Sequence, residues 1–140
     1  MKKIAILLIM LMGITAMCGA CSTKYQWSDA INDMNTLKDC GFTVYLENTQ
    51  EEIDASNELL NSQLKFSQKN FEVTLVNICN LKKADSSICG FKEFASETQA
   101  KQMYDYYREI SSQQKVVRLG CIIIQTNSDE VISILKYDFQ

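Results

Sequence analysis

Residues 71–94, FEVTLVNICNLKKADSSICGFKEF, decide the fold of this chain. From Phe71 to Cys79, apolar and polar residues alternate and then give way to a mostly apolar end. The stretch 81–87 is mostly polar, and a second apolar-rich run follows from Ile88 to Phe94. Two strand-like runs joined by a short polar loop predict an antiparallel β-hairpin.

Two capping boxes predict helices on either side of this hairpin. Thr49-Gln50-Glu51-Glu52 precedes one set of helically spaced apolar residues, and Ser96-Glu97-Thr98-Gln99 precedes a second set with cleaner spacing. The apolar faces are expected to comprise Ile53, Leu60 and Leu64 in the first helix, and Ala100, Met103, Tyr107 and Ile110 in the second.

Two further strands are expected outside these helices. Residues 42–47 alternate between apolar and polar types, which indicates a strand. Residues 116–125 form a longer strand-like run that contains Gly120. A glycine inside a strand pattern indicates either a bulge or a tight turn that splits the strand in two.

Helical spacing over 27–37 and 131–135 adds one helix at each end of the domain. The complete order is α, then β-α-β-β-α-β, then α. The six central elements match the ferredoxin-like split β-α-β-β-α-β sandwich, an antiparallel sheet with helices on one face. We therefore expect a single α+β domain over 27–140, in which the additional N- and C-terminal helices cover the open face or an edge. This topology hosts many unrelated activities and specifies none of them.

The first 21 residues carry a targeting signal. A basic start at residues 1–3 is followed by an apolar run over 4–17 and by Cys18-Gly19-Ala20-Cys21. This arrangement is typical of a secretory signal peptide. The small pair directly before Cys21 also resembles the lipobox of bacterial lipoprotein precursors, although Cys18 stands where that family usually has an aliphatic residue.

The lipobox resemblance implies cleavage before Cys21 and a diacylglyceryl group, carrying chains such as palmitate, on its sulfur. Residues 1–20 would then be the signal peptide, and 21–26 the lipidated cysteine with a short tether. Two acyl chains hold a protein stably at a membrane. We therefore expect a protein anchored by lipid to the extracytoplasmic face of the cell membrane. The alternatives are plain secretion and an uncleaved span over 4–20, which is at the short limit for a bilayer.

Four cysteines remain in the domain: Cys40, Cys79, Cys89 and Cys121. An even number outside the cytosol is typical of disulfide formation. Cys79 closes one hairpin strand and Cys89 opens the next, and the ferredoxin-like topology would bring Cys40 beside Cys121, so we predict these two pairs. The alternatives are one bridge with two buried thiols, or free thiols throughout. The domain lacks the closely spaced cysteine pairs that zinc and redox sites use.

The composition excludes several classes of function. The chain contains no His, which rules out Ser-His-Asp triads, Cys-His dyads and imidazole metal sites. Its net charge of −3 becomes −5 without residues 1–20, so no basic excess is available for a nucleic acid. The sequence has neither a glycine-rich phosphate loop nor a G-x-S-x-G motif. We expect no cofactor, no metal and no enzymatic activity.

Three residues of the second predicted helix are the remaining candidates. Tyr104, Tyr106 and Arg108 flank Tyr107, and interfaces favour such residues, so they form a possible interaction surface. Alternatively, the tyrosine rings cover the edge of the core. The sequence thus predicts a binding or interaction domain at the cell surface, with an envelope protein or a small ligand as its partner. The alternatives are an accessory subunit of an envelope transport or secretion complex and an enzyme of unrecognised type.

Overall fold

The computed structural model describes residues 25–140 and shows a mixed α+β domain. The predicted signal peptide, Cys18 and Cys21 lie outside the described residues. In chain order the elements are α2 (Trp27–Asp39), β1 (Thr43–Leu46), α3 (Gln50–Phe66), β2 (Leu75–Lys82), β3 (Ile88–Phe94), α4 (Glu97–Ile110), β4 (Lys115–Leu119), β5 (Ile122–Thr126) and α5 (Asp129–Leu135).

The strands form one antiparallel sheet in the order β1-β2-β3-β5-β4. The predicted hairpin is confirmed, because β2 pairs with β3 from Leu75 opposite Phe94 to Lys82 opposite Ile88. Its first strand begins four residues later than Phe71, and its loop is shorter than expected because Lys82 still pairs with β3. The hairpin strand β3 lies in the middle of the sheet.

The strand order differs from the ferredoxin-like order, in which the first and last strands are neighbours. Gly120, at a φ of 66°, sits in a tight turn that splits the predicted last strand into β4 and β5. β5 takes the place beside β3, and β4 lies at the edge of the sheet opposite β1. The hairpin strands β2 and β3 therefore lie between β1 and both parts of the predicted last strand, which the predicted topology placed side by side.

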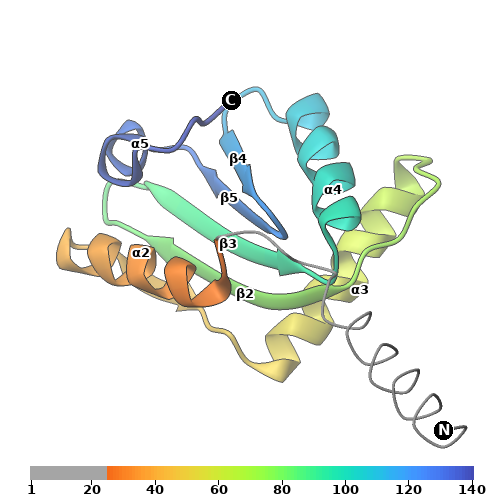
Figure 1. Ribbon diagram of the computed structural model, residues 1–140, viewed down its shortest axis with the longest axis horizontal. Helices are drawn as coiled ribbons and strands as arrows, with labels where there is room; N and C mark the ends of the chain where they lie inside the picture. Colours follow the sequence, from red (N-terminus) through yellow and green to blue (C-terminus); the bar gives the residue numbers. More distant parts are fainter. Residues whose placement is uncertain (1–24) are drawn as a thin grey trace, which may run out of the picture.

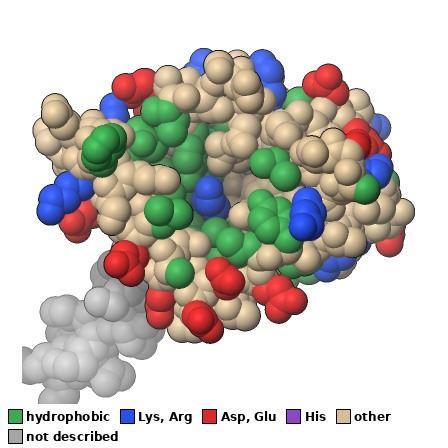
Figure 2. Space-filling view, turned by 180° about the vertical axis from the view of Figure 1, so that it is seen from behind, with side chains coloured by type: hydrophobic (Ala, Val, Ile, Leu, Met, Phe, Trp, Pro, Cys, Tyr) green, Lys and Arg blue, Asp and Glu red, His purple; other side chains and the backbone are tan. Residues whose placement is uncertain are grey.

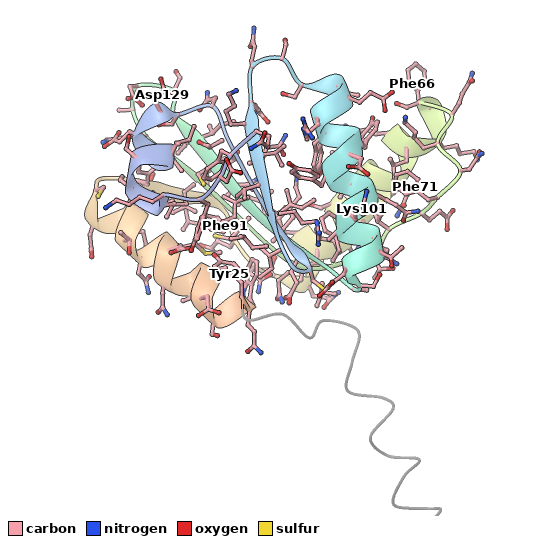
Figure 3. All side chains as sticks on the ribbon, turned by 45° about the horizontal axis from the view of Figure 1, so that its top comes forward. Tyr25, Phe66, Phe71, Phe91, Lys101 and Asp129 are labelled. Atoms are coloured by element: carbon pink, nitrogen blue, oxygen red, sulfur yellow. The ribbon has the colours of Figure 1, made fainter. Side chains whose placement is uncertain are left out.

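Helices cover both faces of the sheet and give the domain three layers (Figure 1). On one face, Leu37 of α2 and Val131 of α5 share a buried core with the central-strand residue Phe91, which is labelled in Figure 3. On the other face, Leu64 of α3 and Met103 of α4 share a second core. The helices before and after the central elements thus cover the face that a ferredoxin-like sheet leaves open.

Local signals in the sequence explain where the helices begin and end. The Thr49 side chain accepts a hydrogen bond from the backbone N–H of Glu52, and Ser96 accepts one from Gln99, as the capping boxes predict. After α2, Gly41 adopts a φ of 96°, which glycine reaches without a steric cost. The chain can therefore leave α2 at this position and turn toward β1.

The C-terminal segment, residues 136–140, is fastened to both α2 and β4. The Tyr137 hydroxyl donates a hydrogen bond of 2.8 Å to Asp33 Oδ2 of α2. Gln140 exchanges two backbone hydrogen bonds with Val116 of β4, at 3.1 and 3.0 Å. These contacts place the segment along the outer edge of the sheet.

Candidate functional site

The predicted bridge between Cys79 and Cys89 is absent, because both residues are buried free thiols. Cys79 lies opposite Phe91, whereas Cys89 lies opposite Leu81, so the two cysteines are diagonal rather than facing each other. Diagonal residues are separated by about 7–8 Å, which exceeds the Cα separation of most disulfides. Burial raises the pKa of both thiols and keeps them unreactive.

The predicted pair of Cys40 and Cys121 is also absent, because Cys40 is an exposed free thiol. Cys40 follows α2 next to β1, whose Thr43 pairs with Lys82 at the hairpin end of the sheet. The backbone carbonyl of Cys121 accepts a hydrogen bond from Phe94, at the other end of β3. The strand order therefore keeps these two cysteines apart.

The predicted interaction surface on α4 is divided in the structure. Tyr106 is buried, and its hydroxyl lies 3.0 Å from that of Ser67 on the α3 side. Tyr107 is buried as well and accepts a hydrogen bond from the Lys92 ammonium. Tyr104 and Arg108 remain accessible, so the prediction is wrong for Tyr106 and leaves the other two residues as candidates.

Tyr104 and Arg108 line a groove of about 540 Å³ between α4, β4 and the C-terminal segment. Arg118 of β4 lines the same groove. We call it the two-arginine groove, because Arg108 and Arg118 are the two arginines of the chain. Its lining is completed by Val117, Leu119, Tyr137, Asp138 and Gln140.

Each arginine is held by its surroundings without being neutralised. The Arg108 guanidinium lies over the Tyr104 ring, 5.6 Å from its centroid. Arg118 Nη1 donates a 3.0 Å hydrogen bond to the backbone carbonyl of Gly120, which leaves most of its donors for other partners. All ion pairs among residues 25–140 use lysine instead. Both guanidinium groups therefore keep their charge available to a ligand.

The charges in the groove differ from those of the domain as a whole. The groove holds two guanidinium groups and the carboxylate of Asp138, whose Oδ1 accepts a hydrogen bond from Gln140 Nε2 at 3.0 Å. The side chains of its lining thus carry a net charge of +1 in a chain of net charge −3. On the face shown in Figure 2, acidic side chains gather along the lower edge and basic side chains are scattered elsewhere. A local pair of arginines is therefore the feature that could select an anion.

The wall of the groove is fixed by a pair of tyrosines on one carboxylate oxygen. Tyr25, labelled at the start of α2 in Figure 3, donates to Asp33 Oδ2 at 2.6 Å, and Tyr137 donates to the same atom. The two rings meet edge to face, with centroids 5.8 Å apart. Burial and then the hydrogen bond to Asp33 raise the pKa of Tyr137 to about 12. The hydroxyl therefore stays protonated and holds the C-terminal segment in place.

A second groove, of about 800 Å³, lies between α3 and the segment before β2. Two of its asparagines are already used by the fold: Asn57 donates to the Leu75 carbonyl, and Asn61 donates to that of Val73. Its Lys69 is paired with Glu109 at 2.6 Å. Because three of its polar groups are already used by the fold and its lining contains no arginine, this groove is the weaker candidate.

The structure adds residues to the site that the sequence pattern did not indicate. Arg118 lies within a strand pattern, and Tyr137, Asp138 and Gln140 lie beyond the last predicted helix. The pairing of Gln140 with Val116 and the hydrogen bond from Tyr137 to Asp33 place the C-terminal residues beside β4 and α4. The restriction of arginine to positions 108 and 118 is the one signal in the sequence that could have linked them.

The chemistry of the site is that of an anion binder. Arginine presents a planar set of donors that matches carboxylate and phosphate groups. In the part of the chain that the structure describes, no group of Cys, Asp or Glu side chains is arranged to hold a metal ion. The chain matches no protein-family model, no curated protein and no solved structure at a significant level.

Proposed function

We propose that this chain is a lipid-anchored extracytoplasmic binding protein whose two-arginine groove takes a ligand that bears a carboxylate or phosphate group. The observation that supports this proposal most strongly is that both arginines of the chain line one groove. Neither of them makes an ion pair within residues 25–140. Arg108 is exposed and Arg118 is half-buried, so both guanidinium groups can reach a ligand and form charge-assisted hydrogen bonds with its anionic group.

Binding fits the groove better than acid–base catalysis does. A guanidinium stays charged at physiological pH and neither takes up nor releases protons there. The Tyr137 hydroxyl is committed to Asp33, and its raised pKa disfavours proton transfer near neutrality. These groups can therefore position an anion without transforming it.

The anchor supports the proposed location. Cys21 precedes the first helical residue, Trp27, by six positions, which an extended chain spans in at most about 22 Å. A lipid on Cys21 would thus keep the groove close to the bilayer surface. Among residues 25–140, no helix has the length and apolarity needed to cross a membrane.

Calorimetric titration of the full chain in detergent micelles with inorganic phosphate and with acetate tests the proposed function. We expect weak binding of at least one anion, reduced by roughly tenfold or more in the double variant Arg108→Gln/Arg118→Gln. Lys65→Gln/Lys115→Gln is the matched control, because it removes the same two charges from exposed residues that do not line the groove. Binding that is equal in the double variant and the wild type would refute the proposal.

A metabolic labelling experiment tests the anchor separately. Radiolabelled palmitate should enter the wild-type chain and be lost from the Cys21→Ala variant. Incorporation that survives this substitution would show that Cys21 is not the attachment site.

A further inference from the structure

The outer edge of β4 is only partly paired. Val116 exchanges both of its backbone hydrogen bonds with Gln140. In an antiparallel strand, the backbone groups of alternate residues point to the same side. The N–H and C=O of Arg118 therefore point to the same outer edge as those of Val116.

The C-terminal segment turns away before it can cover Arg118. Continuing the pairing of Gln140 with Val116 by two residues would place Asp138 opposite Arg118. Instead, the Phe139 N–H bonds to the Tyr137 carbonyl at 3.0 Å, which is the hydrogen bond of a γ-turn. Among the described residues, the two bonds at Val116 are the only backbone hydrogen bonds between this segment and β4.

Because of this bend, the backbone of Arg118 at the edge of β4 stays unpaired on its outer side within the described part of the chain, and this edge borders the two-arginine groove. One side of the groove offers the backbone N–H and C=O of Arg118. The Arg108 and Arg118 guanidinium groups lie in the same lining, together with the rings of Tyr104 and Tyr137. A small inorganic anion would bind only the guanidinium groups, whereas a peptide would also form hydrogen bonds with the backbone N–H and C=O of Arg118.

We propose that the ligand of the groove is an extended peptide segment that carries a carboxylate, an inference that rests on the proposed function. The peptide adds to the edge of β4 as a short strand, and its main chain pairs with the backbone of Arg118. Its carboxylate, either the C-terminal group or an Asp or Glu side chain, lies against Arg108 and Arg118. Because Gln140 occupies Val116, the added strand is only two or three residues long.

Fluorescence anisotropy with the full chain in detergent micelles tests this inference. The probe is fluorescein-labelled Gly-Gly-Val-Tyr-Val with a free C-terminal carboxylate. Its C-terminal amide is the neutral comparison, and the amide of Gly-Gly-Val-Asp-Val places the carboxylate on a side chain. We expect one of the two carboxylate peptides to bind roughly tenfold more tightly than the neutral amide, and the stronger one identifies the source of the carboxylate.

Two further measurements separate strand addition from simple charge attraction. Methylation of the backbone nitrogen of the probe's Tyr residue keeps the carboxylate but removes a main-chain donor, and we expect it to weaken binding about tenfold. Arg118→Gln should weaken binding by a similar factor, and Lys115→Gln should leave it unchanged. Circular dichroism melting of both variants checks that they fold.

The possible failures of the two proposals are distinguishable. If phosphate or acetate binding depends on Arg108 and Arg118 but the peptides bind no better than acetate, the peptide inference is overturned and the proposed function stands. If N-methylation has no effect on a tight peptide complex, strand addition is overturned. If neither inorganic anions nor peptides bind in an arginine-dependent way, both proposals fail.

Discussion

Replacement of Asp33 by alanine should loosen the C-terminal segment from α2. Asp33 Oδ2 accepts hydrogen bonds from Tyr25 at 2.6 Å and from Tyr137 at 2.8 Å. A hydrogen bond to a charged group contributes about 1.5–3 kcal/mol, so two such bonds set an upper limit of about 6 kcal/mol. Both tyrosines are only partly buried, and water replaces part of what is lost. We therefore expect the free energy of unfolding to fall by about 2–3 kcal/mol.

Urea unfolding followed by circular dichroism measures this loss. The matched control is Asp39→Ala, which removes an exposed acid from the last turn of the same helix. Tyr137→Phe removes one of the two hydrogen bonds and should cost about half as much as Asp33→Ala. If the free energies of unfolding of Asp33→Ala and of the Asp39→Ala control differ by less than about 0.5 kcal/mol, the hydrogen bonds to Asp33 do not hold the C-terminal segment in place.

Three further predictions concern packing, pH and thiol reactivity. A Cβ at Gly90 would lie 2.7 Å from Asn80 Oδ1, so Gly90→Ala should lower the free energy of unfolding by about 1–3 kcal/mol in urea titrations, and no loss would contradict this close approach. In the folded protein the pKa of Tyr137 is raised from its ordinary value of 10 to about 12. The protonated hydroxyl therefore stabilises the fold fully below pH 10, and this contribution is lost as the pH rises through 12. Tyr137→Phe should flatten that alkaline decline in stability, and an unchanged slope would argue against it. In the native protein, Ellman's reagent should label the exposed Cys40 and spare the buried Cys89 until unfolding, whereas equal rates would contradict the burial.

Local patterns predicted most of the elements but not their arrangement in the sheet. The capping residues Thr49 and Ser96 and the periodic apolar positions are short-range features, and the structure confirms the helices that they indicate. The strand order depends instead on pairings between distant segments, because β1 pairs with β2 and β5 pairs with β3. A bulge or a full turn at Gly120 decides only whether the last strand is one or two, and both are compatible with the same residues.

The errors at the cysteines follow from the strand order for one pair and from the hairpin register for the other. The pairing of Cys40 with Cys121 required the first and last strands to be neighbours, and they lie at opposite edges of the sheet. The pairing of Cys79 with Cys89 required a register in which they face each other. A shift of two residues in that register leaves both cysteines on the same face but places them diagonally.

The sequence predicted the residues that α4 contributes to the candidate site but not those from β4 and the C-terminal segment. Tyr104 and Arg108 were found because aromatic and arginine residues cluster on one helix. Helical spacing alone did not show that Tyr106 turns inward to meet Ser67 of the α3 end. The other half of the groove comes from β4 and from a segment that follows the last helix, and it depends on contacts between residues far apart in the chain.

The most direct test of the central claim is the side-chain spectrum of the two arginines. In the full chain labelled with ¹⁵N-arginine, Arg108 and Arg118 should give two side-chain Nε–H signals, since the sequence contains no other arginine. On titration with the free-acid peptide Gly-Gly-Val-Tyr-Val or its Asp-containing counterpart, we predict that both signals shift together with one dissociation constant. A peptide complex that forms while both signals stay in place would contradict the claim that these two arginines bind the ligand.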